Sequence, residues 1–159
     1  MPFTLTEFYK PENYRLQGSV VYLMVRNKSV YQRLADTRLA DLGITAAQMS
    51  VLMMVAHNEG PTISSITQLL GINAAATVRM IHRLESMDLI QKIPSKSDKR
   101  VIDLSLTQAG KRLAKSIPER LCSLLNQSLA GFTAAEFEQL KDFLLRIEQN
   151  NLLQLKDAS

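Results

Sequence analysis

Residues 62–106 constrain the fold most strongly, because two short helical patterns and a hairpin pattern follow one another there without a linker. Apolar residues recur at helical spacing from Ile63 to Leu70, which gives the first helix one apolar face. Gly71 supplies the positive φ that a turn between two helices often needs. Asn73 can cap the following helix by accepting hydrogen bonds from its first backbone N–H groups. The segment therefore predicts two helices joined by a tight turn.

The second of these helices has two chemically different sides. Its apolar side consists of Thr77, Met80, Ile81, Leu84 and Met87. Its other side carries Ala75, Arg79, His82 and Ser86, flanked by Val78 and Arg83. This layout is typical of a helix-turn-helix, whose second helix can lie in the major groove of DNA.

Two short β-branched segments, 89–93 and 101–106, follow directly and flank the turn-rich basic stretch 94–100. They predict a hairpin with a charged tip attached to the second helix, which together make a winged helix-turn-helix. An ordinary helix pair followed by a solvated hairpin is the alternative that the pattern alone leaves open.

Four short motifs occur in order here: R-x-x-x-R-L-E from Arg79, L-I at 89–90, D-x-R at 98–100 and L-T-x-x-G at 106–110. This set resembles the signature of MarR-type (multiple antibiotic resistance regulator) transcription factors, and the likeness extends over most of the chain. The resemblance implies a mainly α fold with a small β-hairpin wing. It divides the single chain 1–159 into a DNA-binding lobe at 45–106 and a helical dimerisation region at 1–42 and 107–159.

The charge of the chain is concentrated in one stretch. The net charge is +4, and residues 79–115 alone hold nine cations against four acids, an excess of 9 − 4 = +5. A local basic field of this kind suits a phosphate backbone, although charge runs are usually solvated faces.

From these patterns we expect DNA contacts from Ser64, Ser65, Asn73, Ala75, Val78, Arg79, Arg83, Lys96, Lys99 and Arg100. Arg79, at the middle of the exposed face, is expected to contact a base or a phosphate. Arg83 is expected to contact a phosphate, or to pair with Glu85 or a nearby acid. Arg100 resembles the family arginine that enters the minor groove, and Asp98 is expected to orient that loop by pairing with an arginine.

Two departures from the family pattern stand out. The recognition helix begins with Asn73 and the three alanines 74–76, where relatives often have Ser, Thr or Lys, so direct base readout is expected to be sparse. Asp88 stands where relatives usually have Gly, so the turn after the helix is expected to carry some strain. The alanine-rich start also supports an alternative function, a winged-helix protein-interaction module without sequence-specific DNA binding.

The flanking segments predict further helices. A helical pattern over 13–41 is ended by Gly43, and Thr45 with Gln48 has the form of a capping box. The helix that follows is apolar nearly all round, which predicts a buried floor beneath the helix-turn-helix.

After the hairpin, Thr107 can cap a long helix that Pro118 is expected to kink or divide. A further helix is expected between the capping box of Thr133 with Glu136 and Leu155. The terminal helices hold more apolar surface than a small winged domain needs, so we expect a homodimer. A monomer that folds its arms back on itself is the alternative.

The remaining expectations concern chemistry. The chain has two histidines and none of the common catalytic or metal-binding motifs, so we expect no enzyme activity, no metal and no cofactor. The resemblance implies a repressor that binds a palindromic operator and is released by a small aromatic or phenolic ligand. By position, a cleft for such a ligand would be lined by Tyr22, Arg26, Met54 and His57.

The single cysteine, Cys122, allows no intrachain disulfide and is expected to be a small buried residue. Family members that sense oxidants typically do so through a cysteine in the N-terminal helix, which has none here, so a redox role for Cys122 is not expected. The sequence shows no membrane-length apolar run and no signal peptide, so we expect a cytoplasmic protein without a membrane partner.

Overall fold

The computed structural model describes residues 6–57, 61–95 and 98–157. These residues are mainly helical and include one two-stranded antiparallel sheet, which confirms the predicted fold class. The chain forms two compact units, Met1–Leu121 and Cys122–Ser159. The boundary lies inside a helix and does not coincide with the division at 45–106 suggested by the sequence. The assignment of the terminal helices to dimerisation stays a prediction.

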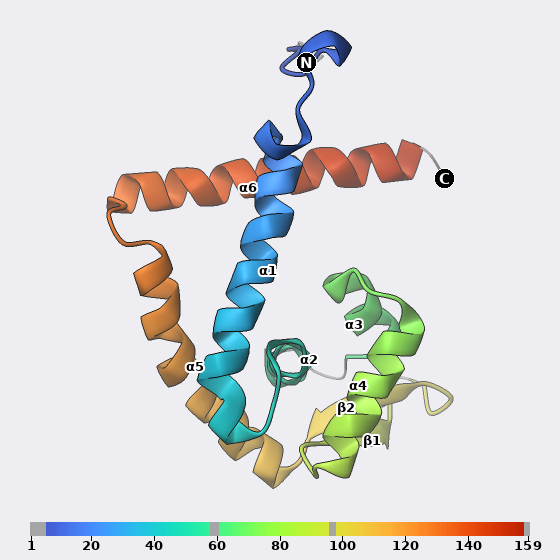
Figure 1. Cartoon of the computed structure of the whole chain (residues 1–159). Helices are drawn as coiled ribbons and strands as arrows, with labels where there is room; N and C mark the ends of the chain where they lie inside the picture. The colour runs from blue at the N-terminus through green and yellow to red at the C-terminus, as the bar shows by residue number, and fades with distance from the viewer. Residues whose placement is uncertain (1–5, 58–60, 96–97, 158–159) are drawn as a thin grey trace. The chain divides into compact units, whose positions relative to one another are not determined.

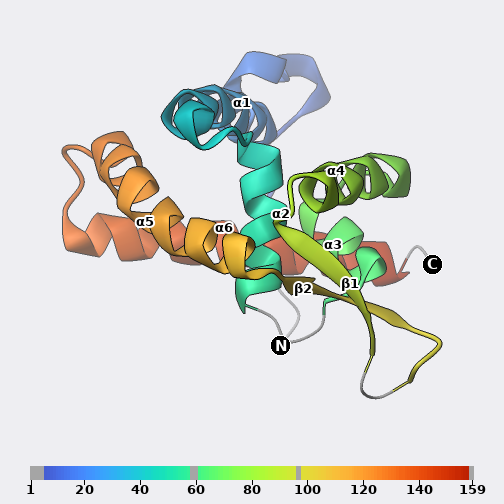
Figure 2. The ribbon, with the colours of Figure 1, turned by 90° about the horizontal axis from the view of Figure 1, so that it is seen from below.

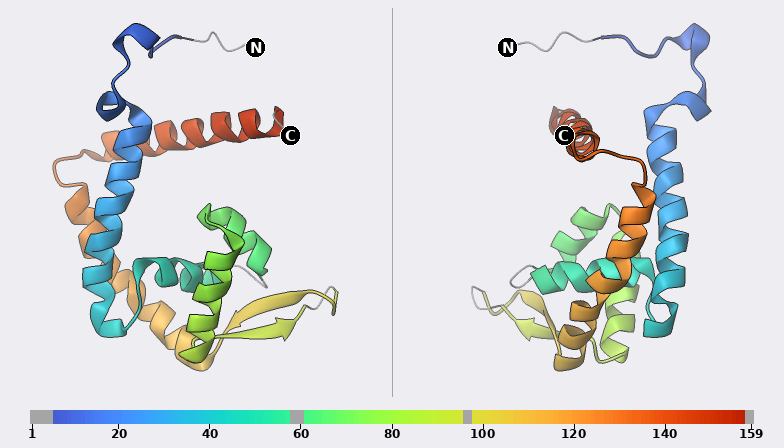
Figure 3. Two further views of the ribbon diagram at one scale, coloured as in Figure 1. Left: turned by 45° about the vertical axis from the view of Figure 1, so that its right-hand side comes forward. Right: turned by 90° about the vertical axis from the view of Figure 1, so that its left-hand side faces the viewer.

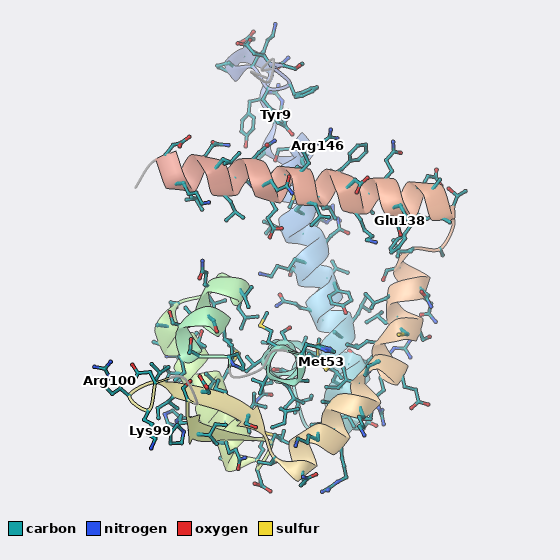
Figure 4. The ribbon with its side chains drawn as sticks, turned by 180° about the vertical axis from the view of Figure 1, so that it is seen from behind. Tyr9, Met53, Lys99, Arg100, Glu138 and Arg146 are labelled. Atoms are coloured by element: carbon teal, nitrogen blue, oxygen red, sulfur yellow. The ribbon has the colours of Figure 1, made fainter. Side chains whose placement is uncertain are left out.

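The first unit begins with a long helix, α1 (Val20–Leu39), which follows two short 3-10 turns. Ser19 caps α1 by accepting a hydrogen bond from the backbone N–H of Tyr22 at 3.2 Å. The hydroxyl of Tyr9 accepts from the N–H of Val20 at 2.9 Å, so a residue of the N-terminal arm also satisfies this helix end (Figure 4). The helix is therefore shorter than the predicted 13–41. A 3-10 turn at Ala40–Leu42 extends it to Gly43, whose φ of 70° ends it as expected.

Helix α2 (Ala46–His57) starts at the predicted capping box. The N–H of Thr45 donates to Oε1 of Gln48 at 2.9 Å, and the N–H of Gln48 donates to Oγ1 of Thr45 at 3.2 Å. The helix contacts α1, the second strand, and the helices α3 (Ile63–Leu70) and α4 (Ala74–Ser86), so the expected floor beneath the helix-turn-helix is present (Figure 1). Its last turn departs from the prediction, since Ala56 and His57 are exposed.

Helices α3 (Ile63–Leu70) and α4 (Ala74–Ser86) form the helix-turn-helix. Gly71 between them has a φ of 61°, and Oδ1 of Asn73 caps α4 by accepting from the N–H of Ala76 at 2.8 Å. The apolar sides of both helices meet, and the fully buried side chains include Ile66, Thr77, Ile81 and Leu84. Both the turn and the apolar faces are as the sequence predicted.

The end of α4 is closed by a residue in the left-handed region. Asp88 has a φ of 54°, and it is the only non-glycine residue with positive φ in the described parts of the chain. The N–H of Leu89 donates to the carbonyl of Leu84 at 2.9 Å, and the N–H of Asp88 donates to that of Glu85 at 2.9 Å. This pair of hydrogen bonds is the Schellman arrangement, which glycine normally closes, and Asp88 adopts the left-handed conformation that this turn requires.

The hairpin consists of β1 (Ile90–Pro94) and β2 (Ile102–Leu106), with Ile90 opposite Leu106 and Pro94 opposite Ile102. Figure 2 shows it extending from the end of α4 and the start of the next helix, α5 (Gln108–Ser128). Leu104 and Leu106 of β2 are buried, whereas both residues of the Pro94–Ile102 pair are exposed. The base of the hairpin therefore belongs to the core, and its far end extends into solvent.

Helix α5 (Gln108–Ser128) begins at a close junction with the end of α4. Oγ1 of Thr107 donates to the carbonyl of Asp88 at 2.5 Å and accepts from the N–H of Gly110 at 3.0 Å. The N–H of Thr107 donates to the carbonyl of Leu89 at 3.2 Å. A Cβ on Gly110 would lie 1.9 Å from that same carbonyl oxygen. This packing explains physically why Thr and Gly occur together in the L-T-x-x-G motif.

Helix α5 runs through Pro118 as one continuous α-helix, so the proline does not divide it. In the second unit, Gly131 has a φ of 89° and ends the turn after α5. Helix α6 (Ala134–Asp157) then begins at the expected capping box, where the N–H of Thr133 donates to Oε2 of Glu136 at 2.8 Å. Backbone and side-chain hydrogen bonds from Thr133 lower the pKa of the Glu136 carboxyl. Figure 3 shows α6 as a long straight helix in its left view and nearly end-on in its right view.

The prediction for Cys122 was wrong. It was expected to be buried, but its side chain is exposed on α5, whereas Leu121 and Leu124 are buried. The apolar stripe of α5 passes through the leucines on either side of the cysteine, and position 122 lies off that stripe.

Among the described residues, no single helix is long and apolar enough to cross a membrane. Two consecutive helical segments, Val20–Leu42 and Ala46–His57, are together long and apolar enough for a membrane span, but the chain bends by 76° between them.

We predict that Gly110→Ala destabilises the protein strongly, because the new methyl group would collide with backbone at Leu89 rather than with a movable side chain. The expected loss is about 1–3 kcal/mol of unfolding free energy, measured by urea denaturation at fixed protein concentration. Gly18→Ala is the matched control, since a Cβ at Gly18 meets nothing within 4 Å. Equal stability of the two variants would contradict the junction described above.

Candidate nucleic-acid interface

The face of α4 that points away from the core is small and cationic. Ala75, Arg79, His82, Arg83 and Ser86 are exposed, and Val78 is half-buried. This is the side that the helical wheel placed outward, so the structure brings together four of the predicted DNA-contacting residues on α4, and a fifth, Asn73, caps the same helix. An exposed helix face of this kind fits the width of a major groove.

Glu85 connects α4 to the hairpin through an ion pair that the sequence did not reveal. Its Oε2 atom lies 2.8 Å from Nζ of Lys92 on β1 and 3.3 Å from Nδ1 of His82. The sequence suggested Arg83 as a partner for Glu85, but among the described residues Arg83 forms no salt bridge. Glu85 pairs with Lys92 and His82 instead. Lys92 lies seven residues after Glu85 and on a different element, so helical spacing alone does not indicate this pair.

At the start of α3, the two serines differ in what their hydroxyls do. The hydroxyl of Ser65 accepts from the N–H of Thr62 at 3.0 Å and donates to the carbonyl of the same residue at 2.9 Å, as half of a capping box. Ser64 is exposed. Of the two residues predicted to contact phosphate, Ser64 is therefore the better placed.

At the tip of the hairpin, Asp98 and Arg100 form the expected pair. Nη2 of Arg100 lies 2.9 Å from Oδ2 of Asp98, and its Nε lies 3.1 Å from Oδ1, while the backbone N–H of Arg100 also donates to Oδ1 at 3.0 Å. These side-chain and backbone hydrogen bonds lower the pKa of the Asp98 carboxyl, and the same pair raises the pKa of Arg100.

The Arg100 side chain is 90% exposed, and Figure 4 shows it extending outward from the tip together with Lys99. Lys96, the third predicted cation of the wing, lies outside the described residues. The geometry thus presents a guanidinium that is held in one orientation by a carboxylate and is otherwise open to solvent.

A pocket of about 450 Å³ opens between the end of α2, the end of β2 and the first half of α5. Its apolar lining includes Met53, Ala56, Leu106, Ala114 and Pro118. Its polar lining consists of His57, Gln108, Lys111, Arg112 and Lys115. The described lining residues thus include three cations and no acid, a combination that suits an organic anion with an apolar body.

Of the four residues predicted to line an effector cleft, His57 lines this pocket. Tyr22 is half-buried and Arg26 exposed on α1, and Met54 is half-buried on α2; none of the three is among the residues that line it. In the described parts of the chain, no group of three or more His, Cys, Asp or Glu side chains could hold a metal ion.

The fold and these surfaces define a class: a winged helix-turn-helix domain with long terminal helices. Residues 44–102 match the model of the MarR family. These residues are therefore a MarR family domain, and the chain is a homologue of the MarR regulators.

Relatives and solved structures agree with this assignment. The multiple antibiotic resistance protein MarR of Salmonella typhimurium is 29% identical over 131 residues, which cover 82% of this chain and 89% of MarR. The transcriptional repressor MdtR of Bacillus subtilis is 26% identical over 125 residues, covering 77% and 81% of the two chains. The crystal structure of a mutant MarR from E. coli complexed with operator DNA is 27% identical, with a TM-score of 0.71 over 80% of this chain and 92% of that one.

Proposed function

We propose that this chain is a DNA-binding transcriptional regulator that binds a palindromic operator as a homodimer and acts as a repressor. The observation that carries the proposal is the pair of exposed arginines, Arg79 on the outward face of α4 and Arg100 at the tip of the hairpin that follows it. In this proposal α4 enters the major groove, Arg100 enters the adjacent minor groove, and Ser64 and Lys99 contact phosphates. The E. coli MarR relative that was crystallised with operator DNA supports it.

The homodimer is proposed because the terminal helices expose large apolar side chains. On α1, Val21 and Val25 are 67% and 63% exposed, and on α6, Leu145 and Leu152 are 52% and 51% exposed. No residue of α6 is buried in the single chain. Apolar helix surfaces of this extent usually belong to an interface, and a two-fold dimer would present two copies of α4 to two half-sites about one helical turn apart.

The decisive test of DNA binding is Arg100→Ala. Fluorescence anisotropy with the DNA upstream of the gene is expected to show about ten- to a hundredfold weaker binding, because one groove contact is lost. Lys141→Ala, which removes one exposed cation from α6, is the matched control and should bind like the wild type.

A scrambled duplex and a salt series complete this experiment, because a regulator should prefer its own site and lose affinity steeply with salt. Weak and equal binding of both duplexes, unchanged by Arg100→Ala, would favour the alternative protein-interaction module. The alanine-rich start of α4, where Ala74 and Ala75 are exposed, is the observation that favours that alternative.

The dimer is tested by placing charge on the exposed face of α6. Sedimentation equilibrium should give twice the chain mass of 17.8 kDa for the wild type. Leu145→Lys with Leu152→Lys should weaken dimerisation by at least about tenfold, because two apolar contacts per chain are replaced by ammonium groups. The control is Leu69→Lys, at a leucine on α3 that is 63% exposed. A wild-type monomer would contradict the proposal.

We further propose that a small organic anion with an aromatic body releases the DNA by binding the pocket beside His57. A ligand there would contact both α2, which packs against α4, and α5, so it could bias the position of the recognition helix. As a probe, 2-naphthoate should bind and weaken DNA affinity, whereas the neutral 2-naphthalenemethanol should not.

Lys111→Gln with Lys115→Gln should abolish the effect of the naphthoate, and Lys141→Gln should leave it intact. An unchanged response of the double variant would exclude this pocket as the effector site. Unchanged DNA affinity with saturating naphthoate in the wild type would argue against release by such an anion.

A further inference from the structure

His82 lies on the candidate DNA-binding face of α4, but it is not among the residues expected to contact DNA. Its side chain is 64% exposed on the outward face of α4, one turn after Arg79 and next to Arg83 in sequence. Its Nδ1 atom lies 3.3 Å from Oε2 of Glu85, which anchors one side of the ring. The ring is thus part of the same cationic surface as the arginines, and it can change charge between pH 5 and 8.

The elements packed against α4 bring few other charges to this place. Helix α3 carries no charged residue, α2 carries only His57, and β1 carries only Lys92. Lys92 shares the Oε2 atom of Glu85 with His82. The charged groups around the imidazole are therefore Glu85 and Lys92, together with Arg79 and Arg83 on α4 itself.

We infer that His82 is a proton-linked DNA contact, in which binding to DNA takes up a proton at the imidazole. This inference rests on the proposed function. With its Nδ1 facing Glu85, the protonated ring can donate from Nε2 to an acceptor oxygen of the DNA, either a phosphate or a base edge. The DNA supplies negative charge beside the ring, which favours the imidazolium in the complex.

The sign of the pH effect follows from linkage. If the complex binds more protons than the free partners, DNA affinity rises as the pH falls. Uptake of one proton gives at most a tenfold change per pH unit, so binding at pH 6 is expected to be about three- to tenfold tighter than at pH 8. No other residue of the recognition face is a histidine, since the chain has only two.

The experiment measures DNA affinity by anisotropy at pH 6, 7 and 8 and constant ionic strength. His82→Gln keeps a donor but cannot be protonated, so its affinity should be independent of pH and close to that of the wild type at pH 8. His82→Arg is permanently charged, so it should bind tightly and equally at every pH. Lys141→Gln, which changes an exposed side chain of α6, is the matched control and should retain the wild-type pH dependence.

Calorimetric titration in two buffers of different ionisation enthalpy supplies an independent count of the protons taken up, which should be above zero for the wild type and zero for His82→Gln. The outcomes separate the two proposals. Sequence-dependent binding that does not change with pH, or that keeps its pH dependence in His82→Gln, overturns the inference and leaves the proposed function standing. Absence of sequence-dependent binding at every pH overturns both.

Discussion

The carbonyl oxygen of Leu89 is the point on which the arrangement of the first unit depends. It accepts the N–H of Thr107 and lies against the bare Cα of Gly110, while the hydroxyl of Thr107 reaches back to the carbonyl of Asp88. The end of the recognition helix, the base of the hairpin and the start of α5 are therefore joined within a few ångströms. Because backbone groups make most of this junction, the three elements can change position only together.

Local features of the sequence predicted most of the elements and their ends. The cap residues Thr45, Asn73, Thr107 and Thr133 all act as the sequence indicated, because a capping side chain needs only groups within three residues of itself. The hydrophobic stripes likewise gave the buried faces of α3 and α4. These are properties of one helix at a time, so a single sequence suffices to reveal them.

Contacts between elements were not predictable in the same way. The pairing of Lys92 with Glu85 and the pocket beside His57 depend on how separate elements meet. Arg120 of α5 pairs with Asp41 in the 3-10 turn after α1, and these residues are 79 positions apart in the chain. Within the candidate interface, the helical wheel of α4 placed Arg79 and Arg83 on the outer face. It could not show that the hydroxyl of Ser65 is hydrogen-bonded to Thr62 at the start of α3.

The pair at the hairpin tip has an electrostatic consequence for the whole wing. Asp98 and Arg100 carry opposite charges within hydrogen-bonding distance, so seen from afar they cancel and leave a dipole with the guanidinium facing solvent. A dipole attracts a polyanion only at close range, whereas an unpaired cation such as an exposed lysine acts over a Debye length of about 8–10 Å. In the proposed complex, long-range attraction to the DNA would then come from Lys99 and the arginines of α4. Arg100 would discriminate between DNA sequences by the shape of the minor groove, once protein and DNA are in contact. Approach and discrimination would thus be assigned to different cations of the same small domain.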